Sequence, residues 1–195
     1  MPHRHGYKSL RVQALGLAPS LPRVQRSAQP HEPALSLLTD LQQSPCVVAS
    51  HRDGLDATLH LMMRAGVRMV FVSGADGELV GMVTAEDLQG ERPVLRASNQ
   101  QVAHRELSLA DIMVPVTAWD TVDLADVRTA HLGDIAATLH EHNLRYLLVT
   151  QKKQGATVLR GLFSARRLEM AMNTTIEPDL HSRNFAELGQ VLAHH

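Results

Sequence analysis

The regular pattern of the chain begins with the hydrophobic spacing of an amphipathic helix. Apolar side chains recur there at steps of three and four residues: Leu55, Leu59, Met62 and Met63. Gly66 follows the last of them, and a glycine at that point commonly ends a helix. The pattern therefore predicts a helix over 53–65 whose apolar stripe faces a core.

Two hydrophobic runs follow this helix. Residues 69–72 and 79–83 are almost continuously apolar, and the segment 74–77 between them has the glycines of a turn. Strands with unbroken apolar runs are covered on both faces, so helices or a second sheet must pack against them. Thr84 comes directly after the second run and has the side chain of a helix N-cap, so a second helix is expected to begin there.

The same succession of elements returns about eighty residues later. The stretch GMVTAEDL, which begins at Gly81, corresponds to the stretch GLFSARRL, which begins at Gly161. The second copy predicts a helix over 132–139, strands at 146–149 and 158–163, a turn at 152–156, and a helix from Ser164. A short extended piece, Cys46–Val48, precedes the first helix. Neither unit is large enough to close a core alone, so two repeats packed face to face are expected.

The two copies differ in charge where their last helix begins. Thr84 and Asp87 have a structural explanation, because a threonine cap and an acid three residues later both stabilise a helix start. Ser164 keeps the cap in the second copy, but Arg166 and Arg167 follow it. The helix dipole disfavours cations at this end. Capping alone therefore does not require the acid, and a ligand-binding role for Asp87 stays open beside the structural one.

The composition narrows the function classes. A chain of 195 residues that is 44% hydrophobic can bury a core. Its net charge of -1 lacks the basic excess that binding to a phosphate backbone requires, so nucleic acid is not an expected partner. No apolar run reaches the length of a membrane-spanning helix, and a soluble protein without a membrane partner is expected.

The reactive side chains predict no catalytic or metal centre. Cys46 is the one cysteine, so no intramolecular disulfide can form, which favours a reducing, cytoplasmic location. Its place ahead of an apolar strand predicts a buried structural thiol. His140 and His142 point to different faces of a helix, and no nucleophile with a matching base can be assigned. Neither a metal site nor an enzyme is therefore expected.

The order of elements and the closing pattern LVGMVTAEDL resemble the CBS domain family. Together the two copies resemble a tandem CBS pair, often called a Bateman module, over 38–88 and 109–172. The resemblance implies an α/β (α+β) fold of two β-α-β-β-α repeats packed with pseudo-twofold symmetry. The second copy carries an unusually long stretch, 116–131, before its helix, and the sequence does not show its role.

These patterns divide the chain into five parts. They are a basic N-terminal tail at 1–33, the first repeat at 34–90, a linker at 91–108, the second repeat at 109–172, and an amphipathic C-terminal helix within 173–195.

The resemblance also implies a ligand site. In CBS pairs that bind adenine nucleosides, the aspartate that matches Asp87 accepts hydrogen bonds from the ribose hydroxyls, and the residue that matches Thr84 reaches the phosphate. Apolar strand residues surround the adenine, and basic residues meet the phosphate. The ligand-binding residues implied here are Val47, Val48, Arg68, Phe71, Thr84, Asp87, Arg145 and Ser164. For Arg68 and Arg145, a solvent-facing place at the start of a strand remains the alternative.

Two functions follow from this interpretation. The first is a stand-alone regulatory module that binds AMP, ADP, ATP or a related adenosine compound between the repeats and signals to an unidentified protein partner. One site per chain is expected, at Asp87, because Arg167 cannot accept hydrogen bonds from a ribose diol. The alternative is a dimeric interaction scaffold whose nucleotide sites are vestigial. A homodimer is expected in either case.

Overall fold

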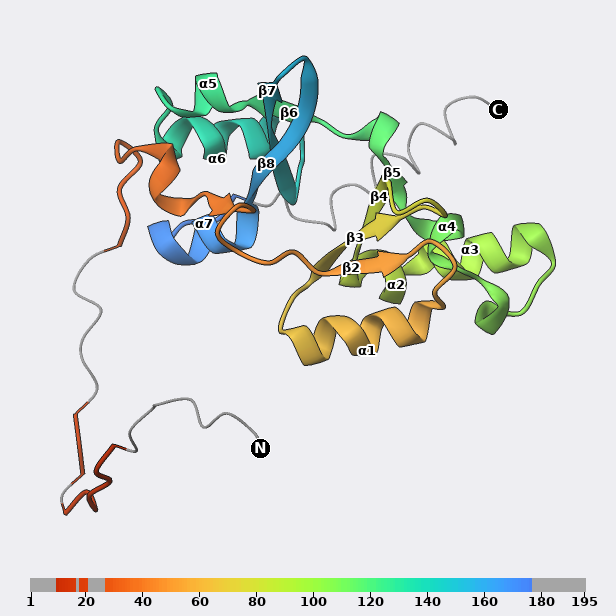
Figure 1. The fold of residues 1–195 in the computed structure, drawn as a ribbon, viewed down its shortest axis with the longest axis horizontal. Helices are drawn as coiled ribbons and strands as arrows, with labels where there is room; N and C mark the ends of the chain where they lie inside the picture. Colours follow the sequence, from red (N-terminus) through yellow and green to blue (C-terminus); the bar gives the residue numbers. More distant parts are fainter. Residues whose placement is uncertain (1–9, 17, 21–26, 177–195) are drawn as a thin grey trace, which may run out of the picture.

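The computed structural model describes residues 10–16, 18–20 and 27–176. Over these residues the chain forms two lobes, each built on a four-stranded sheet with helices packed along it (Figure 1). The predicted α/β fold with two repeats is confirmed. The expected C-terminal helix lies almost entirely outside the described residues. Within them, no helix combines the length and the apolar character needed to cross a bilayer.

The first repeat follows its predicted elements closely. In chain order they are β2 (Val48–Ser50), α1 (Leu55–Ala65), β3 (Met69–Ser73), β4 (Leu79–Thr84) and α2 (Ala85–Gln89). β2 lies parallel to β3, and β4 returns antiparallel to β3. Gly66 ends α1 with a φ of 67°, a left-handed conformation that glycine adopts without strain.

The second repeat has the same order of strands. Its elements are β6 (Thr121–Asp123), α5 (Leu124–Val127), α6 (Leu132–Glu141), β7 (Tyr146–Lys153), β8 (Ala156–Ser164) and α7 (Ala165–Met172). β6 lies parallel to β7, which pairs antiparallel with β8. The long stretch 116–131 therefore contains the strand equivalent to β2. The strands of the β7–β8 hairpin are longer than predicted, because their outer, more polar residues continue the ladder of backbone hydrogen bonds beyond the buried part.

The segment expected to be a linker is structured. It contains α3 (Glu91–Gln100) and η2 (His104–Glu106), and α4 (Leu109–Ile112) follows it. Leu107, Leu109 and Ile112 are buried in the core of the first repeat. By contrast, Ala34 in η1 (Ala34–Leu37) is buried in the core of the second repeat. Each core is thus completed by residues from the segment where the other repeat begins.

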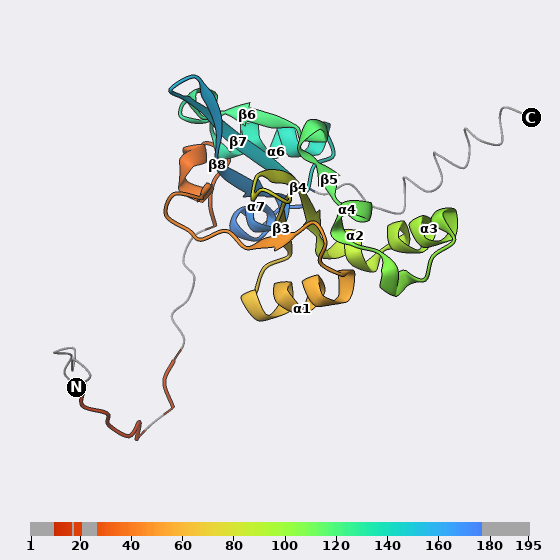
Figure 2. The ribbon, with the colours of Figure 1, turned by 45° about the vertical axis from the view of Figure 1, so that its right-hand side comes forward.

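The sheets exchange their edge strands in the same way. β1 (Thr39–Asp40) pairs antiparallel with β8 of the second repeat, and β5 (Val114–Pro115) pairs antiparallel with β4 of the first. The strand orders are β1-β8-β7-β6 and β2-β3-β4-β5. The chain consequently crosses from one lobe to the other between β1 and β2, as the two views show (Figures 1 and 2).

Two glycines at equivalent positions admit these exchanged strands. A Cβ added at Gly81 would lie 2.9 Å from the carbonyl oxygen of Val114 in β5. One added at Gly161 would lie 2.7 Å from the carbonyl oxygen of Thr39 in β1. Because the obstacle is backbone in both cases, it cannot swing aside as a side chain can. The glycines that begin both repeated stretches therefore have a packing role at the sheet edge.

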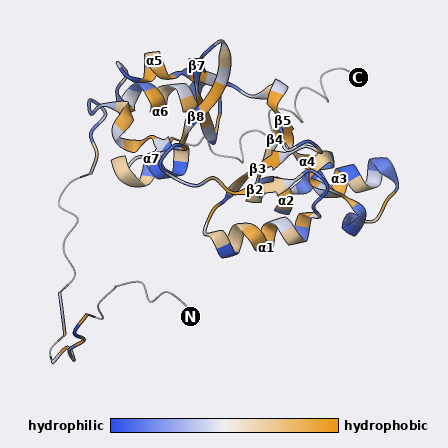
Figure 3. Ribbon diagram, viewed as in Figure 1, coloured by the Kyte–Doolittle hydropathy of each residue, from blue (hydrophilic) through white to orange (hydrophobic). Residues whose placement is uncertain are grey.

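The two lobes meet through a third hydrophobic cluster. Phe71 of β3, Leu148 of β7 and Leu162 of β8 are its buried members. The ring centroids of Phe71 and Trp119 lie 6.1 Å apart, within the range of aromatic packing. Hydrophobic residues colour much of β3 and β4 in the ribbon (Figure 3). The repeats therefore share a packed interface, which fixes the clefts on either side of it.

Residues 28–41, called the N-terminal strap here, hold the exchanged strand β1 against the second repeat. The backbone N–H of Leu132 donates to the carbonyl oxygen of Glu32 at 2.9 Å. The backbone N–H of Leu41 donates to the carbonyl oxygen of Arg160 at 3.1 Å. Arg160 also donates to both carboxylate oxygens of Asp40. This hydrogen bonding holds the pKa of the Asp40 carboxyl below its ordinary value of 3.8.

Replacing Gly161 with alanine tests the strand exchange. We expect Gly161→Ala to lower the free energy of unfolding by about 1–3 kcal/mol, because the added methyl group must push β1 away from β8. Gly81→Ala should have a similar effect at β5. Urea unfolding measures both. Gly16→Ala is the control, since no atom lies within 4 Å of its added Cβ; equal stability of all three variants would contradict the prediction.

The Asp40–Arg160 ion pair predicts a pH dependence. Because the folded state has the lower pKa at Asp40, the pair stabilises the fold above the unfolded-state pKa, and this contribution is lost as the pH falls through the folded-state pKa. The difference in unfolding free energy between the wild type and Asp40→Asn should stay constant from about pH 8 to about pH 5 and shrink below about pH 4. A difference that rises on acidification would contradict this assignment.

Candidate functional site

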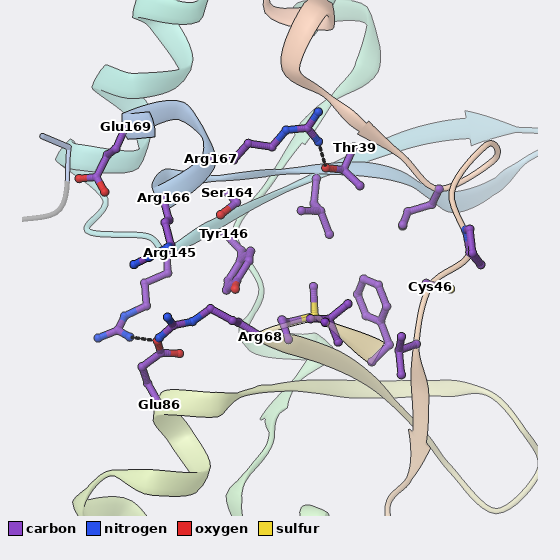
Figure 4. Close-up of a pocket in the computed structure, with 18 residues that line it drawn as sticks. Thr39, Cys46, Arg68, Glu86, Arg145, Tyr146, Ser164, Arg166, Arg167 and Glu169 are labelled. Atoms are coloured by element: carbon purple, nitrogen blue, oxygen red, sulfur yellow. Dashed lines mark hydrogen bonds and ion pairs between the residues drawn. The ribbon is translucent and has the colours of Figure 1, made fainter. Parts of the chain in front are cut away.

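A cavity of about 500 Å³, called the first cavity here, lies between the two repeats (Figure 4). The segment from β1 to β2, the start of β3 and Glu86 of α2 supply one part of its wall. The start of β7, the end of β8 and the first turns of α7 supply the other. A ligand in this cavity would therefore contact both repeats at once, and its size falls within the range of small-molecule sites.

One end of the first cavity is strongly basic. Its charged lining residues are Arg68, Arg145, Arg166 and Arg167, with Glu86 and Glu169. Glu86 forms ion pairs with both Arg68 and Arg145, the latter at 3.5 Å. Arg167 donates to the hydroxyl of Thr39 at 2.9 Å. Among the described residues, neither Arg166 nor Arg167 has a carboxylate partner, so this end retains positive charge for an anion.

The other end of the first cavity is mostly apolar. It is lined by Leu41, Cys46, Val47, Met69, Phe71 and Leu162. Phe71 is only 3% exposed, so its ring forms a fixed wall. Figure 4 shows Cys46 at the side opposite to Arg145 and Arg166. An apolar end facing a basic end suits a ligand with a flat hydrophobic group and an anionic tail.

Two residues near this wall differ from expectation. The prediction of a buried Cys46 is wrong, because the thiol is exposed. The cause is the crossing of the chain between the lobes, which ends only at Val48, the first residue of β2. Val48 is itself 48% exposed and lines neither of the cavities described here. The burial of the apolar strand thus begins one residue later, at Ala49.

A second cavity of about 770 Å³ is also lined by both repeats, and it shares Glu86, Arg145 and Tyr146 with the first cavity. Thr84 and Asp87 line it, together with Trp119, Asp120 and Tyr146. The structure therefore separates residues that the sequence grouped in one site. The twofold arrangement has this effect, because it sets the start of α2 beside the strands of the second repeat.

The carboxylate of Asp87 is committed to its own helix. Its Oδ2 atom accepts hydrogen bonds from the backbone N–H of Thr84 at 2.9 Å and from the Thr84 hydroxyl at 2.8 Å. The Thr84 hydroxyl in turn accepts from the N–H of Asp87, which completes a capping box. Its Oδ1 atom accepts from Arg92 at 2.6 Å. A ribose diol could bind this carboxylate only by displacing these partners.

Ser164 occupies the equivalent position in the second repeat but does not cap its helix. No side-chain capping bond is present there, and Ser164 lines the first cavity. The two repeats also reverse charge, since Glu86 and Asp87 correspond to Arg166 and Arg167. The first cavity has four arginines and two glutamates. The second has two arginines, Arg92 and Arg145, and the four acids Glu86, Asp87, Glu91 and Asp120.

The sequence missed three features of this site. Arg166 contributes to the basic end, Thr39 orients Arg167, and Trp119 lines the second cavity. The Arg166–Arg167 pair at a helix start was visible in the sequence as an unfavourable placement, and this signal could have indicated an anion site. The contribution of Thr39 had no local signal, because it depends on the strand exchange. Among the described residues, no group of three or more His, Cys, Asp or Glu side chains could hold a metal ion.

Comparison with solved structures supports the fold. An uncharacterized conserved protein from Pyrococcus horikoshii is 19% identical, with a TM-score of 0.51, over 77% of this chain and 99% of that one. The CBS-pair protein CBSX2 from Arabidopsis thaliana is 21% identical, with a TM-score of 0.47, over 72% and 94%. A structure of CBSX2 in complex with AMP also matches, at 21% identity and a TM-score of 0.49, over 72% and 95%. At these identities the comparison with the P. horikoshii protein shows a shared fold only.

Comparison with sequences identifies the repeat. A search of curated proteins finds no significant match. Residues 38–92 match the sequence model of the CBS domain family. The matched range spans the crossing segment, α1, β3, β4 and α2, which are the elements that the second repeat reproduces in the same order. Residues 38–92 therefore form a repeat of the CBS domain family, and the second repeat shares its order of elements.

Proposed function

We propose that this CBS pair is a regulatory, non-catalytic module that binds an adenine nucleotide in the first cavity and passes the binding event to a partner protein as a change of shape. The observation that carries the proposal is the first cavity itself. It has a basic end and an apolar end, and both repeats line it. A nucleotide has the same two parts, an aromatic base and an anionic phosphate group.

The lining residues give the ligand an orientation. The base lies at the apolar end beside Val47 and Phe71, and the phosphate lies at the basic end. Guanidinium groups form paired, charge-assisted hydrogen bonds with phosphate oxygens. Ser164, whose hydroxyl is not used for capping, supplies a further donor. Five of the residues implied by the family resemblance thus line this cavity: Val47, Arg68, Phe71, Arg145 and Ser164.

This geometry moves the favoured site away from Asp87. The sequence predicted one nucleotide site that used the ribose diol and the Asp87 carboxylate. Both oxygens of that carboxylate already have partners, and its cavity carries more acids than arginines. Arg167 in the first cavity favours phosphate instead. We therefore assign the main recognition to the phosphate group rather than to the ribose.

The signalling part of the proposal rests on the interface between the lobes. A ligand can shift a protein between two arrangements only if it binds one of them more tightly. Two lobes that share edge strands and a central hydrophobic contact can rotate slightly around that contact. A ligand that bridges both repeats would favour one rotation. A homodimer, a cytoplasmic location and a separate protein partner complete the proposal.

A second candidate is a dimeric interaction scaffold with vestigial sites. The specific observation in its favour is the capping box, because Asp87 serves the fold without any ligand. The same binding experiment separates the two candidates.

Calorimetry with adenosine, AMP, ADP, ATP and S-adenosylmethionine tests the proposal. We expect affinity to rise with the number of phosphate groups, and we expect Arg166→Ala and Arg167→Ala each to weaken ATP binding about tenfold, the effect of losing one charge-assisted hydrogen bond. Arg92→Ala is the matched control, because Arg92 lines the second cavity only. If none of the five compounds binds below millimolar concentration, the scaffold replaces the regulatory module.

The two capping positions provide a paired test of structural against binding roles. Thr84→Ala should lower the free energy of unfolding by about 1 kcal/mol, because it removes a formed capping box. Ser164→Ala should leave stability close to wild type and weaken ATP binding, since its hydroxyl faces the first cavity without capping α7. Thermal unfolding and calorimetry are run on both proteins. The reverse pattern would place the ligand in the second cavity.

A further inference from the structure

Glu86 stands between the two cavities. It is the second residue of α2 and lines both the first and the second cavity. Its Oε1 atom pairs with Arg68 from its own repeat and, at 3.5 Å, with Arg145 from the other repeat. Arg68 and Arg145 directly precede the equivalent strands β3 and β7. One carboxylate therefore connects matching positions of the two repeats, as Figure 4 shows.

The interactions of Glu86 are weak enough to exchange. The side chains of Arg68, Arg145 and Glu86 are 53%, 34% and 33% exposed. Ion pairs at such exposure contribute little because water competes with them. A phosphate group offers more acceptor oxygens and, at neutral pH, at least as much negative charge as the carboxylate. An anion at the basic end of the first cavity would thus compete directly with Glu86 for both guanidinium groups.

A release of Glu86 would alter the second cavity. Arg145 also lines that cavity and is one of its two arginines. If Arg145 turns to an anion in the first cavity, the second cavity loses a positive charge and keeps an unpaired Glu86 beside Asp87, Glu91 and Asp120. It then disfavours a second anion. By linkage the effect is reciprocal, so an anion in the second cavity lowers the affinity of the first by the same factor.

We propose that Glu86 is an internal competitor for the phosphate of the ligand and couples the two cavities, so that an anion in the first cavity lowers the affinity of the second cavity for another anion. This inference rests on the proposed function, since it concerns the regulation of the same site. It assigns to Glu86 a role in affinity and in signalling that is separate from the folding of α2, whose capping box is formed by Thr84 and Asp87.

Inorganic pyrophosphate is the probe for the competition, because it contains the anionic group without the base. Calorimetry at low salt should show that Glu86→Gln binds pyrophosphate about two- to fivefold more tightly than the wild type, the range for loss of a partly exposed ion-pair partner. Glu91→Gln is the matched control. It removes the same charge from the second cavity but does not line the first.

Trp119 reports the coupling. It is the only tryptophan of the chain and lines the second cavity. Pyrophosphate should change its fluorescence in the wild type and in Glu91→Gln. The change should be at most half as large in Glu86→Gln at saturating pyrophosphate, because no carboxylate is released there.

The outcomes are distinguishable. Wild-type affinity or an undiminished fluorescence change in Glu86→Gln would overturn the role of Glu86 and leave the proposed function standing. If neither pyrophosphate nor ATP binds to any of these proteins, both proposals fall. Equal tightening by Glu86→Gln and Glu91→Gln would show a general charge effect and would also overturn the specific role of Glu86.

Discussion

The reciprocal exchange of edge strands is the constraint on which the rest of this structure depends. β1 completes the sheet of the second repeat, and β5 completes the sheet of the first. Antiparallel ladder bonds therefore tie each repeat to the segment that introduces the other. The crossing segment after β1 becomes a wall of the first cavity, and Thr39 meets Arg167 there. Without the exchange, the basic and apolar ends of that cavity would not face one another.

The twofold arrangement gives two cavities, and the sequence makes them chemically unequal. Equivalent helix starts carry Glu86 and Asp87 in one repeat and Arg166 and Arg167 in the other. The first pair stabilises the start of α2, in accord with the helix dipole. The second pair opposes the dipole of α7, which is the pattern expected where function outweighs local stability. An anionic ligand would relieve this unfavourable charge, so recognition of phosphate and stability of the helix start are linked.

The sequence predicted the repeated elements well because their signals are local. Helical spacing, apolar runs and the glycine after α1 each involve neighbouring residues, and they specified α1, β3, β4 and their counterparts. Local signals could not test whether Asp87 lies in the same ligand site as Val47 and Phe71. That test required knowing which helix start faces which strand across the interface. The same limit applies to Cys46, whose exposure follows from a chain crossing and not from its neighbours in sequence.

The central claim is that phosphate recognition occurs in the first cavity. A crystal structure of the chain grown with ATP tests it most directly. The account predicts the phosphate groups among the four arginines of the first cavity, Arg68, Arg145, Arg166 and Arg167, with the adenine beside Phe71 and the capping box of Asp87 intact. A nucleotide bound instead in the second cavity, with its ribose hydroxyls on the Asp87 carboxylate, would contradict the account.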